Sequence, residues 1–131
     1  MNLAHILLAA SVTLATPVEK KTHSQVATKA EIAGDVIKFE FKVTVADGLH
    51  LNKDAPWALK LQPTSDIEFK QNKLSRTDLD ENLPGFRVET VAKPKTVKGA
   101  LPYTLTAFVC TDDKKLCYRD VLQGEVVWQR P

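Results

Sequence analysis

The chain has 131 residues, of which 44% are hydrophobic and 26% are charged, and its 18 basic and 16 acidic residues leave a net charge of +2. This length fits one domain with a real hydrophobic core. The balanced charge gives no basic surface of the kind that binds nucleic acid, and no apolar run is long enough to span a bilayer as a helix.

The first 18 residues differ from the rest because they contain no Asp, Glu, Lys or Arg. Their apolar stretch HILLAASVTLA ends in Thr13-Leu14-Ala15, which offers small residues for cleavage after Ala15, and so predicts a secretory signal peptide over residues 1–15. The alternative is a first strand or a buried arm. We expect a flexible segment over 16–24 and the folded domain over 25–131. Export would place the protein in the periplasm or a similar oxidising compartment, where disulfides persist.

The next residues predict a β-hairpin. Residues 25–33 and 36–45 are separated by Gly34-Asp35, a frequent turn signal. The second segment, VIKFEFKVTV, alternates apolar and polar side chains, which is the pattern of a half-buried strand. Asp47-Gly48 then ends it.

Further short strands are predicted along the rest of the chain. Turn signals separate them at the spacing typical of β-sandwiches. Gly124 indicates a bulge or bend in the last one, and residues 73–83 are the one candidate for a short helix, or else a loop. The remaining strand segments cover residues 57–61, 67–69, 85–92, 101–110 and 117–129.

These elements predict an all-β fold, an immunoglobulin-like antiparallel β-sandwich of about seven to eight strands. The apolar positions that share one phase should fill a single core, with Trp57 and Trp128 at its ends. Those positions are Ile37, Phe39, Phe41, Val43, Val45, Leu59, Leu61, Leu105, Ala107 and Val109.

The only two cysteines, Cys110 and Cys117, flank the polar loop TDDKKL between the last two strands. In an antiparallel hairpin they would lie opposite each other, so a disulfide is within reach. Such a bridge closes a short loop and adds little stability, and an exposed disulfide of this kind is the more easily reduced. Cys117 should be the accessible sulfur and Cys110 the sheltered one. Phe108 and Tyr118 should flank them, with Tyr118 pointing to the opposite sheet face.

Other chemistries fit the residues less well. Structural zinc needs four ligands, commonly as two close pairs, whereas this chain offers one wide cysteine pair and scattered histidines. The Cys-x-x-Cys motif of thioredoxin-like enzymes is absent. His50, between two leucines beside a turn, reads as an ordinary surface or core histidine. We therefore expect no metal and no cofactor.

The sequence resembles a known family. Its segments ADGLHLNKDAPWALKL and FVCTDDKKLCY, in an exported all-β chain, are similar to the N-terminal periplasmic domain of the thiol:disulfide interchange protein DsbD and its stand-alone exported relatives, over roughly residues 25–129. The resemblance implies an immunoglobulin-like fold and dithiol–disulfide exchange. It maps the attacking thiolate to Cys117, and the aromatic residue that follows it to Tyr118. Its partners would be a membrane-embedded electron donor and oxidised periplasmic proteins.

Two hypotheses about function remain open. One is a periplasmic thiol:disulfide oxidoreductase that passes electrons through a reversible Cys110–Cys117 disulfide. The other is a non-redox exported binding or structural domain whose hairpin carries a structural disulfide. A reduction potential separates them, because structural disulfides lie below about −300 mV.

Overall fold

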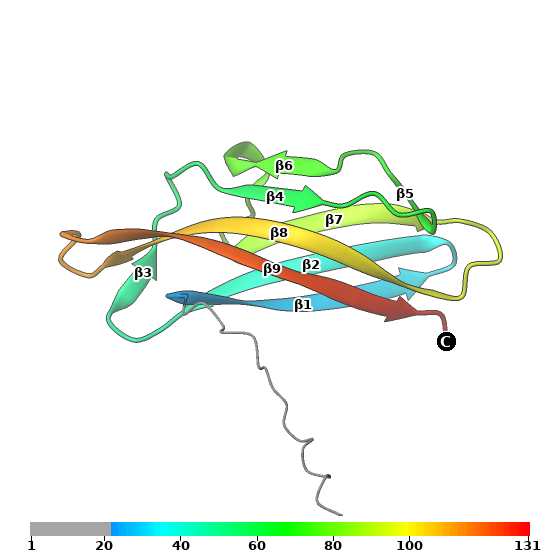
Figure 1. Cartoon of the computed structure of the whole chain (residues 1–131), viewed down its shortest axis with the longest axis horizontal. Helices are drawn as coiled ribbons and strands as arrows, with labels where there is room; N and C mark the ends of the chain where they lie inside the picture. The colour runs from blue at the N-terminus through cyan, green and yellow to red at the C-terminus, as the bar shows by residue number, and fades with distance from the viewer. Residues whose placement is uncertain (1–21) are drawn as a thin grey trace, which may run out of the picture.

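The computed structural model describes residues 22–131, which form two antiparallel β-sheets (Figure 1). The predicted signal peptide over residues 1–15 lies outside the described residues. The predicted all-β sandwich is confirmed. Within the described residues there are nine strands and one 3₁₀ turn: β1 (Ser24–Ala33), β2 (Val36–Val45), β3 (Leu49–Leu51), β4 (Ala58–Leu61), β5 (Ile67–Phe69), β6 (Lys73–Ser75), η2 (Arg76–Asp78), β7 (Gly85–Ala92), β8 (Lys98–Thr111) and β9 (Cys117–Gln129).

The first sheet has the strand order β1-β2-β7-β5. Strands β1 and β2 form the predicted hairpin, with Ala33 opposite Val36 and Gly34 at φ 63°. Such a positive φ favours glycine, because a Cβ atom makes it unfavourable. Strand β1 already begins at Ser24, one residue before the predicted start of the domain.

The second sheet is built around β8. Strand β9 pairs with it in one unbroken register of thirteen residue pairs, from Lys98–Gln129 to Cys110–Cys117. The opposite edge of β8 is shared by β4, which pairs with residues 103–106, and β3, which pairs with residues 109–111. Figure 1 shows the β8–β9 loop at the end of the sandwich opposite the C-terminus. Three strands therefore meet where the two cysteines lie.

The core between the sheets follows the predicted phase. Trp57 and Trp128 are buried, and so is every predicted core position except Val45, which is half-buried. Val45 is the last residue of β2 and lies opposite Ser24 at the end of the β1–β2 ladder. The inward face of β7 completes the core with Phe86 and Val88.

The short helix considered for residues 73–83 does not form, and the alternative, a loop, describes residues 79–83. Residues 73–75 form a strand, because Leu74 turns into the core opposite Leu59 and thereby follows the two-residue period of its neighbour. Only Arg76–Asp78 make a helical turn, in which the Asp78 carboxylate accepts the backbone N–H of Ser75 at 2.9 Å. With β3, this strand raises the count above the predicted seven to eight.

Gly124 does not form the predicted bulge, because it pairs regularly with Tyr103 in the β8–β9 ladder. A Cβ atom at this position would lie 2.8 Å from the Tyr103 hydroxyl oxygen. The glycine therefore makes room for the tyrosine ring rather than bending the strand.

One edge strand of each sheet, β1 of the first and β9 of the second, is joined to the other by a polar cluster of His23, Ser24 and Asp120. The Asp120 side chain is only 5% exposed. Its carboxylate accepts hydrogen bonds from the Ser24 hydroxyl and from the backbone N–H of His23, the latter at 2.9 Å, and lies 3.3 Å from the His23 ring. Buried polar groups are stable only when they are hydrogen-bonded in this way.

Replacing Asp120 with alanine should lower the free energy of unfolding by about 1–3 kcal/mol, because the Ser24 hydroxyl and the His23 N–H lose their buried acceptor. Urea unfolding of the variant measures this loss. Glu125→Ala, an exposed position on the same strand, is the control and should stay within about 0.5 kcal/mol of the wild type. Equal midpoints for both variants would contradict a structural role for the cluster.

Candidate functional site

Cys110 and Cys117 form a disulfide and are the last residue pair of the β8–β9 ladder. The Thr111 N–H donates to the Leu116 carbonyl at 2.8 Å, directly beyond this pair. Cys110 and Cys117 are therefore a non-hydrogen-bonded pair, the kind in which facing residues approach most closely, and their Cα atoms are 4.0 Å apart. The predicted meeting of the two thiols across the strands is confirmed.

The two sulfur-bearing residues differ in their access to solvent. Cys110 is 4% exposed, whereas Cys117 is exposed. Cys110 belongs to β8, which lies between two partners at this point, and Cys117 begins the edge strand β9. A reagent in solution can therefore approach Cys117 more easily than the nearly buried Cys110.

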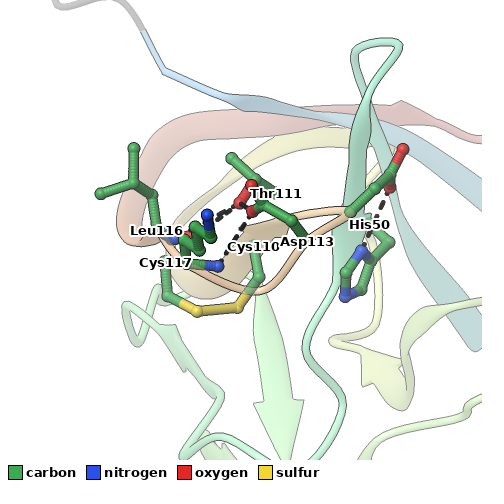
Figure 2. A network of polar contacts seen from close by, with 8 residues as sticks. His50, Cys110, Thr111, Asp113, Leu116 and Cys117 are labelled. Atoms are coloured by element: carbon green, nitrogen blue, oxygen red, sulfur yellow. Dashed lines mark hydrogen bonds and ion pairs between the residues drawn. A yellow bond between two sulfur atoms is a disulfide. The ribbon is translucent and has the colours of Figure 1, made fainter.

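The loop between the cysteines is held by its own hydrogen bonds (Figure 2). The Lys114 N–H donates to the Thr111 carbonyl at 2.8 Å, and Lys114 adopts a φ of 61°. The Asp113 carboxylate accepts from the Thr111 hydroxyl and from the Lys115 N–H. These two bonds, the hydroxyl first, lower the pKa of the Asp113 carboxyl below its usual range. The ionised Asp113 carboxylate therefore stabilises the folded protein at pH values above its ordinary pKa. This stabilisation is lost as the pH falls through the lowered pKa of the folded state.

A third strand brings a histidine to the disulfide. His50 in β3 is the register partner of Cys110. The Asn52 N–H donates to the Phe108 carbonyl at 2.8 Å, and the Asp112 N–H donates to the Gly48 carbonyl at 3.2 Å, so the pair between them belongs to the hydrogen-bonded set. Paired residues project from the same face of a sheet. Figure 2 shows the imidazole and the disulfide on that same side.

The ring of His50 is also paired with the loop. Its Nδ1 atom lies 3.4 Å from an Asp112 carboxylate oxygen, and the His50 side chain is 40% exposed. His50 also borders a surface pocket of about 520 Å³ that both cysteines line. The remaining walls of that pocket are Leu51, Asn52, Lys53, Asp54, Glu81 and Lys114.

The two residues predicted to flank the site occupy different places. Tyr118 pairs with Val109, one position beyond Cys117, and therefore faces the opposite side of the sheet, as predicted. Its ring stacks on His23, with ring centres 3.7 Å apart and planes inclined by 9°. Phe108 is half-buried, two residues before Cys110 on the same strand face. Of these two residues, only Phe108 thus lies on the sheet face that carries the disulfide.

Sequence reasoning did not identify His50 as a neighbour of the cysteines. The sequence contains a weak indication of a short strand at this position, because an apolar–His–apolar triplet follows the Asp47-Gly48 turn. A three-residue strand is too short to show which distant strand it joins. In the described range, 22–131, no three His, Cys, Asp or Glu side chains gather as a metal site would require.

Comparison of the chain with family models, curated proteins and solved structures finds no match. Between residues 22 and 131 there is no helix with the length and apolarity needed to cross a membrane.

Proposed function

We propose that this protein is a thiol–disulfide exchange module that passes electrons between protein partners through the Cys110–Cys117 disulfide. The observation that carries the proposal is the unequal exposure of the two cysteines, 4% for Cys110 against an exposed Cys117 at the edge of the sheet. Exchange proceeds by attack of a thiolate on one sulfur while the other leaves, so one reachable sulfur and one sheltered sulfur match the two roles.

The small structural value of the bridge supports the proposal. It closes a loop of about eight residues, which the chain-entropy relation values at about 2.5 kcal/mol. It also joins two strands that the other twelve residue pairs of the ladder already hold together. A disulfide that served stability alone would contribute more between strands that are distant in sequence.

The resemblance of ADGLHLNKDAPWALKL and FVCTDDKKLCY to the N-terminal domain of DsbD supports the same proposal. We extend it to the compartment and the partners. The protein would act after export, in the periplasm or a similar oxidising space. It would accept electrons from a membrane-embedded dithiol protein and deliver them to oxidised exported proteins.

The reduction potential of the disulfide tests the proposal. We expect a value above about −300 mV, because exposed disulfides that contribute little to stability are readily reduced. Equilibration of the pure protein in glutathione buffers, followed by alkylation and mass spectrometry, measures the reduced fraction. A potential below about −300 mV would instead support a structural disulfide in a non-redox binding domain.

A further inference from the structure

The buried position of Cys110 creates a chemical requirement for exchange. When a partner thiolate attacks Sγ of Cys117, a new S–S bond forms between them and the Cys110–Cys117 bond breaks. Its electron pair stays on Sγ of Cys110, which leaves as a thiolate. Because Cys110 is 4% exposed, water solvates this anion poorly, and burial disfavours the charged form of a thiol. The leaving sulfur needs a proton or a positive charge from the protein.

His50 is the side chain placed to meet this requirement. It is the register partner of Cys110 across β3 and β8, on the face that carries the disulfide. Hydrogen-bonded pairs of this kind hold their Cα atoms about 5.5 Å apart, which is within reach of an imidazole. Histidine is also the side chain that most readily exchanges a proton near neutral pH.

Asp112 positions the ring. Its carboxylate oxygen lies 3.4 Å from Nδ1 of His50, so a proton on Nδ1 has an acceptor there and the imidazolium form has a counter-charge. Nε2 is then the nitrogen available to the sulfur. The other charged groups that line the same pocket are Lys53 and Asp54 after β3, Glu81 from the β6–β7 connection, and Lys114 from the hairpin loop. With two of each sign, they give no net charge that would replace that of His50.

We propose that His50 donates a proton to Sγ of Cys110 when the disulfide opens, and that Asp112 is a positioning residue for it. In the reverse direction the neutral ring removes the proton from the Cys110 thiol. The resulting thiolate attacks Sγ of Cys117 in the mixed disulfide, the partner leaves as a thiolate, and the disulfide re-forms. This inference rests on the proposed exchange function and adds a specific proton donor and acceptor to it.

The test is the second-order rate of reduction of the disulfide by dithiothreitol, a dithiol that supplies both electrons. His50→Gln should react about tenfold more slowly than the wild type in mildly acidic solution, a modest share of the usual range for acid–base catalysis. The ratio of the wild-type rate to the His50→Gln rate should fall as the pH rises, because a ring that has lost its proton cannot donate one to the sulfur. Asp112→Asn should show a smaller loss with the same pH dependence.

His23→Gln is the matched control. His23 is also paired with an aspartate, at 3.3 Å, and is also 40% exposed, but it stacks on Tyr118, which faces the other side of the sheet. Its rate should stay within about twofold of the wild type at every pH, since it has no part in proton transfer to the sulfur.

Equal rates of disulfide reduction for the wild type and His50→Gln across the pH range would overturn the role of His50.

If His50→Gln fails to fold, alkylation of the single thiol in Cys117→Ala provides the second measurement. Iodoacetamide should modify Cys110 more slowly in His50→Asn/Cys117→Ala than in Cys117→Ala alone, and equal rates would refute the inference. A wild-type potential below about −300 mV refutes the proposed function instead, whatever the rate ratio.

Discussion

Replacing Phe41 with alanine is expected to lower the free energy of unfolding by about 3–5 kcal/mol, the usual range for a buried aromatic side chain. Phe41 is 0% exposed in the middle of β2. Its ring meets Tyr103 of the other sheet edge to face, with ring centres 5.0 Å apart. The truncation therefore leaves a cavity between the two sheets and removes an aromatic contact that joins them.

Urea or guanidinium unfolding measures this loss, and Lys42→Ala is the matched control. Lys42 is the next residue on the same strand and is exposed, so its truncation should stay within about 0.5 kcal/mol of the wild type. A loss below 1 kcal/mol for Phe41→Ala would place the core on the other face of β2.

Removing one cysteine at a time should separate the roles of the two sulfurs. Cys110→Ala leaves the exposed Cys117 thiol without its resolving partner, so mixed disulfides with protein partners should accumulate. Cys117→Ala leaves the thiol of Cys110, which is 4% exposed in the native protein, and we expect at least a tenfold smaller yield. Non-reducing gels of the variants, mixed with an oxidised protein substrate, measure the two yields.

The double variant Cys110→Ala/Cys117→Ala is the control and should trap nothing. All three variants should remain folded, because the bridge accounts for only about 2.5 kcal/mol. Equal trapping by both single variants would contradict the assignment of Cys117 as the reacting sulfur. If neither variant captures a partner, the proposed exchange function loses its support and the structural disulfide is favoured.

The long strands could be predicted from the sequence because each has enough positions to show a period of two. The alternation of Ile37, Phe39, Phe41 and Val43 located the core side of β2, and the same pattern located that of β8. Residues 73–75 gave no such pattern, since one inward Leu74 between two polar residues fits a helix or a loop equally well.

The candidate site could be predicted only as far as local sequence reaches. Cys110 and Cys117 are seven positions apart, and the hairpin that joins them follows from adjacent strands. The place of His50 depends on the pairing of β3 with the end of β8, and the burial of Asp120 depends on the start of β1. Both are long-range contacts, and a period-two pattern within one strand does not show which distant residue a side chain meets.

Under the proposed exchange function, the unbroken β8–β9 ladder has a consequence for how a partner would distinguish the two redox states. Twelve further residue pairs continue from the disulfide to Lys98–Gln129, and the loop between the cysteines is fixed by Thr111 and Asp113. Opening the S–S bond therefore leaves the outline of the hairpin the same. The oxidised and reduced forms would then differ for a partner only in the sulfur atoms and their charge. The partner would therefore bind both forms with similar affinity. Under the proposed exchange function, equal affinity for the two forms would leave the potential of the disulfide unchanged on binding, so net transfer would follow the potentials of the free donor and acceptor.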